Sequence, residues 1–157
     1  MDDALNEKFF CSYGVFMKIC VIGGGGAIGG YLAAKLARAG NQVTVVARGK
    51  TLEAIQKNGL TLHMEGESKP LVAKVNAVEK ITDIDMPDAV MLAVKAHQVE
   101  PIIDDLVKII GPNTVLIPMQ NGIPWWYFQR LSGEYQDHPV ETVDAGGLIM
   151  KKIDPRN

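Results

Sequence analysis

The chain alternates between short apolar runs and longer amphipathic segments. The apolar runs are nearly continuous, which is typical of parallel strands covered on both faces of a sheet. They span residues 18–22, 42–47, 88–94 and 114–118. Between the first two runs, a helical period from Ala27 to Ala39 places Ile28, Leu32 and Leu36 on one face, and Gly40 follows as a C-cap. This order of strand, helix and strand predicts an α/β protein with a mostly parallel sheet.

Weaker patterns predict the remaining elements. They comprise a helix over 52–58 capped by Thr51, a hairpin formed by a strand at 60–64 with partners within 69–78, a helix from Pro101 to Ile110, a helix starting near Pro124, and a strand at 140–143. The helix near Pro124 would carry Trp125 and Trp126, which we interpret as core or domain-interface anchors. No further helix is expected after these elements.

Glycines follow the first apolar run. Gly24, Gly26 and Gly29 have the spacing G-x-G-x-x-G between a strand and a helix, which predicts a dinucleotide-binding βαβ unit. Gly24 would allow the tight turn, Gly26 would let the backbone approach a pyrophosphate, and Gly29 would bring the helix close to the strand. The candidate cofactor contacts in this stretch are Gly24, Gly25, Gly26, Ala27, Ile28 and Gly29. The predicted fold is therefore a Rossmann-type, doubly wound, mostly parallel sheet with helices on both faces; the alternative is a glycine-rich turn that binds no nucleotide.

The end of the second strand indicates which dinucleotide is bound. NAD-binding domains usually place an acidic residue there for the ribose 2′-hydroxyl, whereas an arginine suits the 2′-phosphate of NADP. This chain has Arg48 and Lys50 at that place, and no acidic residue before Glu53. The pattern favours NADP(H) over NAD(H), unless Arg48 is an ordinary solvated cation.

Polar residues follow the next strands. Ligands of open parallel sheets bind beyond the carboxyl ends of the strands, which selects Lys95, Asn121 and the turn at Ala145. Lys95 could reach a phosphate or carboxylate, and the amide of Asn121 could hold a ribose hydroxyl or a substrate carbonyl. The alternative for both is a loop residue in water. His97 is a weak candidate for a general base because no carboxylate is placed to orient it.

Composition limits the remaining function classes. The chain has 157 residues, 47% hydrophobic and 22% charged, with a formal net charge of −2, as in one ordinary globular domain. The dispersed Lys and Arg residues argue against nucleic acid, no apolar run is long enough for a membrane span, and two cysteines give no metal site. We expect a cytoplasmic protein with an N-terminal extension at 1–16 that is poorly ordered, a domain at 17–150 and a polar tail at 151–157.

Taken together, these residues resemble the N-terminal NADP-binding domain of the ketopantoate reductase (2-dehydropantoate 2-reductase) family. The resemblance covers about residues 17–150 and is carried by the glycine motif, Arg48, the pair Lys95 and Gln98, and Gln120-Asn121-Gly122. It implies that Gly24 to Gly29 cradle the pyrophosphate, that Arg48 binds the 2′-phosphate, and that Lys95 contacts the cofactor. By the same resemblance Asn121 contacts cofactor and substrate, and Ala145 matches a cofactor-contacting loop by its location.

The implied reaction is hydride transfer from NADPH to a small 2-oxo acid, with ketopantoate giving pantoate on the route to pantothenate and coenzyme A. The pair Trp125-Trp126 is not required by the common pattern and is a candidate mark of a branch whose substrate differs. Family members have a helical second domain that supplies the catalytic lysine, so no catalytic residue is assigned here. We expect this chain alone to bind NADPH but to reduce ketopantoate very slowly or not at all, and a missing C-terminal domain or a second copy to be its partner. The alternative is a stand-alone dinucleotide-binding module or sensor without catalytic activity.

Overall fold

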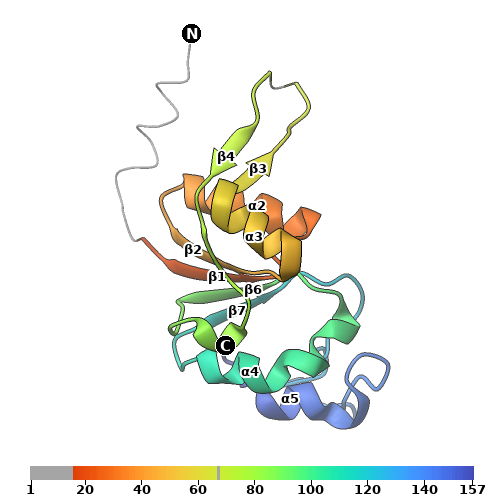
Figure 1. Ribbon diagram of the computed structural model, residues 1–157. Coiled ribbons are helices and arrows are strands. Elements are labelled where there is room, and N and C mark those ends of the chain that lie inside the picture. The colour runs from red at the N-terminus through yellow and green to blue at the C-terminus, as the bar shows by residue number, and fades with distance from the viewer. Residues whose placement is uncertain (1–15, 67) are drawn as a thin grey trace.

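A five-stranded parallel sheet forms the centre of the protein. The computed structural model describes residues 16–66 and 68–157. The strands lie in the order β5-β2-β1-β6-β7 and all neighbouring pairs are parallel (Figure 1). Their bounds are β1 Lys18–Ile22, β2 Gln42–Val46, β5 Asn76–Val78, β6 Ala89–Leu92 and β7 Val115–Pro118. The prediction of a doubly wound, mostly parallel sheet is confirmed.

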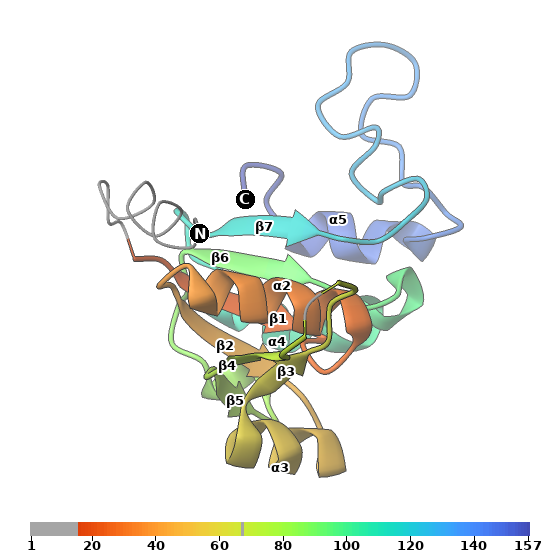
Figure 2. The same ribbon diagram turned by 90° about the horizontal axis from the view of Figure 1, so that it is seen from above.

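Helices cover both faces of this sheet. The helix α2 (Ala27–Arg38) lies on one face, and α4 (Ile103–Ile109) lies on the other (Figures 1 and 2). The helix α3 (Gly49–Asn58) contacts β5, and α5 (Leu148–Lys152) contacts α4. Short 3₁₀ turns occur at Ile81–Asp83, Ala96–Gln98, Glu100–Ile102 and Ala145–Gly147. Among the described residues, no helix has the length and apolarity that crossing a membrane requires.

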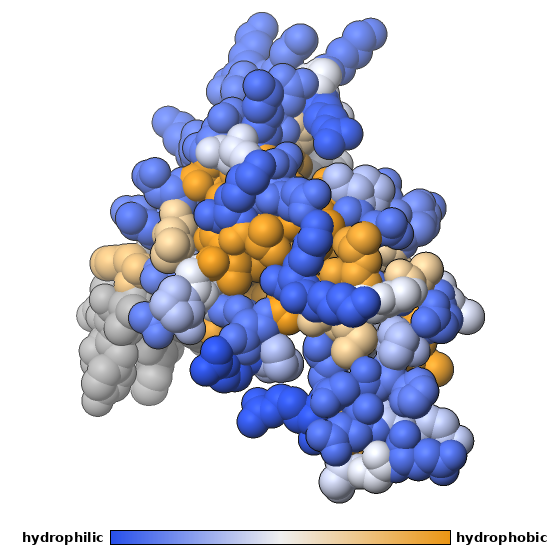
Figure 3. All heavy atoms as spheres, turned by 90° about the horizontal axis from the view of Figure 1, so that it is seen from below, coloured by the Kyte–Doolittle hydropathy of each residue, from blue (hydrophilic) through white to orange (hydrophobic). Residues whose placement is uncertain are grey.

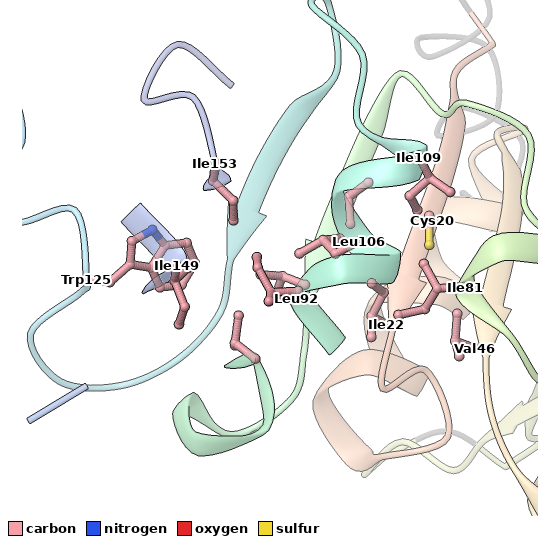
Figure 4. Close-up of a cluster of buried hydrophobic side chains, with 13 residues drawn as sticks. Cys20, Ile22, Val46, Ile81, Leu92, Leu106, Ile109, Trp125, Ile149 and Ile153 are labelled. Atoms are coloured by element: carbon pink, nitrogen blue, oxygen red, sulfur yellow. The ribbon is translucent and has the colours of Figure 1, made fainter. Parts of the chain in front are cut away.

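The core consists of two apolar clusters, one on each face of the sheet. Successive residues of a strand point to opposite faces, so Cys20 and Ile22 of β1 pack toward α4 while Ile19 and Val21 pack toward α2. Figure 4 shows the α4-side cluster, in which Leu106 lies near the strand residues. Seen from below, apolar atoms gather in the middle of the α4 face and polar atoms surround them (Figure 3). Burial on both faces explains why the strand sequences are continuously apolar.

The expected hairpin is only partly present. Strand β3 (Leu60–Leu62) pairs antiparallel with β4 (Leu71–Ala73) as expected, and this hairpin contacts α2. The second half of the segment expected to pair with β3 instead forms β5, which pairs in parallel with β2. The hydrogen bond from Ala47 N–H to Val78 O, 3.0 Å long, continues that pairing. The chain therefore leaves the hairpin after Ala73 and extends the main sheet.

Three expectations after β7 are wrong. The helix near Pro124 is a series of turns, because Arg130 has a φ of 59° and the Phe128 carbonyl accepts from Asp137 N–H. The strand at 140–143 is a turn, because the Val140 carbonyl accepts from the N–H groups of both Val143 and Asp144. The chain forms α5 although no helix was expected after Gly147.

The helix expected over 52–58 begins at Gly49, so Thr51 lies in its first turn.

The burial of Cys20 can be tested by thiol labelling. Its side chain is fully buried in β1, and this desolvation raises the pKa of the thiol to about 12. In a Cys11→Ser variant, Cys20 is the remaining cysteine. At pH 8 its thiolate fraction in the folded protein would be about 10⁻⁴. We expect a thiol reagent to leave the folded variant unlabelled for hours and to label it within minutes in denaturant, as measured by intact mass. Fast labelling without denaturant would contradict the burial of Cys20.

Candidate functional site

A cleft opens where the direction of the sheet reverses. From β1 the chain passes through α2 to β2 on one side, and from β6 it passes through α4 to β7 on the other side. Ligands of open α/β sheets bind at such a switch point. The cleft at the carboxyl ends of these strands has a volume of about 830 Å³. It is lined by Ile22, Gly23, Gly25, Gly26, Val46, Ala47, Arg48, Thr51, Glu79, Lys80, Ile81, Val94, His97, Gln98, Pro101, Ile102 and Asp105.

The glycines form the floor of this switch-point cleft. The tight turn is made by Gly23, which has a φ of 88°, and not by Gly24 as expected. Gly24 is instead needed for packing, because an added Cβ would lie 2.6 Å from Val45 Cβ. An added Cβ at Gly29 would lie 2.4 Å from the Gly23 carbonyl oxygen. This contact is the close approach of helix and strand that the motif predicts.

Gly26 differs from the other glycines of the turn. It is the N-cap of α2 with an ordinary φ of −85°, and an added Cβ would meet only the Gly23 carbonyl oxygen, at 3.3 Å. Its missing side chain therefore leaves room on the cleft side. The first N–H groups of a helix have no partner within the helix, and α2 has neither a side-chain cap nor an acidic residue in its first turn. Backbone donors at the start of α2, including Ala27 and Ile28, are consequently available for an anion.

Arg48 lies on the other wall of the cleft. It lies two residues after the end of β2 and is the N-cap of α3. Its side chain is exposed, and among the described residues no carboxylate lies within ion-pair distance of its guanidinium. Of the cleft carboxylates, Asp105 is paired with Lys108, at 2.7 Å. The guanidinium is therefore free to bind an anionic ligand.

The residues after β6 show what sequence reasoning missed. His97 and Gln98 line the cleft, whereas Lys95 does not. The Lys95 backbone N–H donates to Gln98 Oε1 at 2.9 Å, which fixes the turn that carries both residues. The sequence motif contains Gln98, but no local pattern marks Ile81 and Ile102 as cleft residues, because their position depends on the packing of α4. Among residues 16–66 and 68–157, no carboxylate forms an ion pair with the His97 ring.

Asn121 lies in a second, shallow pocket. This Asn121 pocket has a volume of about 20 Å³ and is lined by Ala96, Gln120, Asn121, Gly122, Ile123, Pro124, Trp125, Trp126 and Val143. Gln120 attaches this segment to the sheet, because the Gln120 amide Nε2 donates to the carbonyls of Leu92 and Val94, at 3.1 and 3.0 Å. Its Oε1 is buried without a donor among the described residues. Ala145 lines neither the cleft nor this pocket in the described part of the chain.

The glycine turn, the switch-point cleft and the sheet order define a Rossmann-type α/β domain, the class that binds dinucleotides at this edge. The family model described as "Ketopantoate reductase PanE/ApbA" matches residues 19–125. The chain therefore belongs to the ketopantoate reductase family, whose members are dinucleotide-binding oxidoreductases.

Individual relatives agree with this assignment. A 2-dehydropantoate 2-reductase from Mesorhizobium japonicum is 46% identical over 141 residues, which cover 89% of this chain and 42% of that protein. The oxidoreductase YkpB of Bacillus subtilis is 33% identical, over 85% of this chain and 41% of that protein. The chain thus spans less than half the length of these relatives.

Solved structures show the same fold. A crystal structure from Ralstonia solanacearum MolK2, named as a ketopantoate reductase, superposes with a TM-score of 0.78 and 38% identity over 88% of this chain and 42% of that one. A D-mandelate dehydrogenase solved with NADH and anilino(oxo)acetate has a TM-score of 0.60 and 29% identity, over 69% of this chain and 34% of that one.

Asp144 anchors the long loop behind the Asn121 pocket. Its side chain is 2% exposed, with Oδ1 accepting from Ile149 N–H at 2.7 Å and Oδ2 from Met150 N–H at 2.9 Å. Both donors belong to the first turn of α5, so this carboxylate caps the helix from outside it. The cap also fixes the loop relative to Ile149, which packs in the same core cluster as Trp125 (Figure 4).

We expect Asp144→Ala to lower the free energy of unfolding by roughly 2 to 3 kcal/mol, because hydrogen bonds to a buried charge are lost. Chemical denaturation followed by circular dichroism measures this change. Asp85→Ala is the matched control, since Asp85 is an exposed carboxylate, and its effect should stay within about 0.5 kcal/mol. Equal effects of the two substitutions would show that Asp144 does not anchor the loop.

Proposed function

We propose that this chain binds NADP(H) and forms the cofactor-binding part of a reductase that converts a 2-oxo acid, ketopantoate, into the corresponding 2-hydroxy acid. The observation that carries the proposal is the switch-point cleft, in which the open glycine face at Gly26 and the unpaired Arg48 line the same space. A dinucleotide needs two such anion sites, one for the pyrophosphate and one at the adenosine ribose when a 2′-phosphate is present.

The glycine floor fits a pyrophosphate. The open position at Gly26 and the unpaired N–H groups at the start of α2 offer donors without a side chain in the way. Lys80 and Arg48 add positive charge along the cleft, whereas Glu79 and Asp105 lie among its lining residues as well. The backbone donors are therefore the main anion site, and their geometry does not depend on a flexible side chain.

Arg48 favours NADP(H) over NAD(H). It stands two residues after β2, in the region where an NAD-binding domain usually has an acidic residue for the ribose hydroxyls. A guanidinium can donate two parallel hydrogen bonds to a phosphate. Because a solved relative is complexed with NADH, the preference for NADP(H) rests on Arg48 itself.

Asn121 is the residue proposed to meet the substrate. When bound, the reduced nicotinamide supplies the hydride that is added to the carbonyl carbon of the 2-oxo acid, and the carbonyl oxygen receives a proton. The Asn121 amide can donate to that oxygen or to a ribose hydroxyl and thereby orient the reacting groups. Lys95, exposed after β6, can add a cation near the same edge. No described residue is assigned as the proton donor, so slow or absent turnover by this chain alone stays part of the proposal.

Gly26→Ala tests the pyrophosphate site. We expect the variant to keep the melting temperature of the parent within about 3 °C, because the added Cβ meets only one atom at 3.3 Å. It should bind both NADPH and NADH at least tenfold more weakly, since the Cβ occupies the space of the pyrophosphate. Fluorescence titration of each cofactor gives the affinities. Unchanged affinity in a folded variant would refute a pyrophosphate at this turn.

Arg48→Gln tests the choice of cofactor. We expect NADPH binding to fall roughly 10- to 100-fold, the size of a charge-assisted hydrogen-bond pair, and NADH binding to change less than about threefold. Arg38→Gln is the control, because Arg38 is an exposed arginine at the opposite end of α2. A parent protein that binds NADH more tightly, or an equal loss for both cofactors in Arg48→Gln, would remove the preference for NADP(H).

A further inference from the structure

Two cations stand at corresponding positions after the parallel strands β2 and β5. The register of these strands pairs Val46 with Val78. The Ala47 N–H donates to the Val78 carbonyl at 3.0 Å, so the pairing continues past the end of β2. Arg48 follows one member of the pair by two residues, and Lys80 follows the other by two residues. Because neighbouring strands lie about 4.8 Å apart, the chain brings these two residues out of the sheet side by side.

The backbone fixes both residues at the switch-point cleft. Arg48 is the N-cap of α3, and Lys80 is the N-cap of the 3₁₀ turn at Ile81–Asp83. The Lys80 carbonyl accepts from Asp83 N–H at 3.2 Å. Ile81, the next residue, is buried in the α4-side core cluster and so attaches this turn to the body of the protein. Both cations line the cleft, and both are exposed.

No carboxylate neutralises this pair of charges. In the part of the chain that the structure describes, neither Arg48 nor Lys80 forms an ion pair. Glu79 and Asp105 also line the cleft, but Glu79 pairs with neither cation, and Asp105 is paired with Lys108. Like charges at neighbouring positions of a sheet repel each other. An anion bound between the two side chains would remove this repulsion, so the pair is suited to an anionic ligand.

The adenosine end of the cofactor is the place where these charges fit. In dinucleotide-binding domains the adenosine ribose lies at the end of the second strand of the βαβ unit, which is where Arg48 stands. A phosphate monoester carries a charge of about −1.5 to −2 at neutral pH and has three terminal oxygens. It can therefore accept two hydrogen bonds from a guanidinium and a third from an ammonium at the same time.

We propose that Lys80 is a second specificity-determining residue for NADP(H), and that its ammonium binds the same 2′-phosphate as the Arg48 guanidinium. This inference rests on the proposed function, because it takes the 2′-phosphate to lie beside Arg48. It extends that function by assigning the choice of cofactor to cations from two neighbouring strand ends, those of β2 and β5. NADH has no 2′-phosphate, so Lys80 makes no comparable contact with it.

Three small nucleotides isolate the adenosine end of the site. Adenosine 2′,5′-bisphosphate carries the 2′-phosphate, adenosine 3′,5′-bisphosphate has the same charge at the neighbouring hydroxyl, and 5′-AMP lacks the second phosphate. Calorimetric titration of the parent chain at low salt gives the affinity of each. We expect the 2′,5′ isomer to bind at least about tenfold more tightly than the 3′,5′ isomer, because a bidentate contact depends on position as well as charge.

Lys80→Gln tests the second cation. We expect binding of NADPH and of the 2′,5′ isomer to fall about three- to tenfold, and binding of NADH and 5′-AMP to stay within about twofold. Lys74→Gln is the matched control, because Lys74 is an exposed lysine that does not line the cleft. Lys80→Arg keeps the charge and should retain most of the parent's affinity for NADPH. If Lys80→Gln does not fold, Lys80→Met keeps the apolar stem and gives the same comparison.

The double variant Arg48→Gln/Lys80→Gln should bind the two bisphosphate isomers equally well, whereas each single variant should retain part of the preference. An equal loss for NADPH and NADH in Lys80→Gln, or no loss for NADPH, would refute the role of Lys80 and leave the proposed function standing. A parent chain that binds neither NADPH nor NADH would refute the proposed function itself. A parent that binds NADPH but does not distinguish the isomers would refute a 2′-phosphate site between the two cations.

Discussion

The close contact between α2 and the turn after β1 determines the rest of the structure. At Gly29 the helix backbone approaches so near to the Gly23 carbonyl oxygen that a Cβ would lie 2.4 Å from it. Overpacking of this kind in a closely packed interior typically costs about 1 to 3 kcal/mol. Because α2 lies so close to the turn after β1, the N-terminus of α2 points into the switch-point cleft. The strand after α2, β2, can then pair with β1 along its whole length. One steric constraint thus fixes both the sheet and the anion site.

Coverage of the sheet on both faces explains where the polar residues are. The interior strands bury their side chains toward α2 or α4, so polar groups that need water or a ligand are displaced to the strand ends. In a parallel sheet the carboxyl ends lie at one edge, which brings Gly26 and Arg48 together although they are far apart in the sequence. The same logic applies to Cys20, whose thiol is buried because it lies within a strand rather than at its end.

Local patterns predicted the central part of the fold because local geometry decides it. The bounds of α2 follow from Gly26 and Gly40, and the place of Arg48 follows from the end of β2. The segment after β7 could not be predicted in this way. Its aromatic residues have a helical spacing, but Trp125 packs into the core while Trp126 faces outward, and the turns are set by Asp137 and Arg130.

The helix α5 was missed for a related reason. It has five residues, too few for a periodic signal, and its cap Asp144 stands outside the helix. Asn121 follows the end of β7, as the sequence predicts, but it lines the Asn121 pocket and not the switch-point cleft. Gln120 fixes this position because its amide donates to the carbonyls of Leu92 and Val94. Such contacts depend on the folded sheet and leave no mark in the local sequence.

The two parts of the candidate site are therefore stabilised by different interactions. Backbone geometry around Gly23 and Gly26 forms the proposed pyrophosphate site. An added Cβ at Gly23, Gly24 or Gly29 would clash with neighbouring atoms, whereas one at Gly26 would meet only the Gly23 carbonyl oxygen. The surface at Ile123 and Trp126 is formed by side chains on a loop, which Trp125 and Asp144 attach to the core. A substitution at Trp126 changes this surface and removes its edge-to-face contact with Trp125, but it leaves the burial of Trp125 and the hydrogen bonds of Asp144 in place. The proposed cofactor site is consequently constrained by the fold itself, whereas the loop surface beside Asn121 is less constrained.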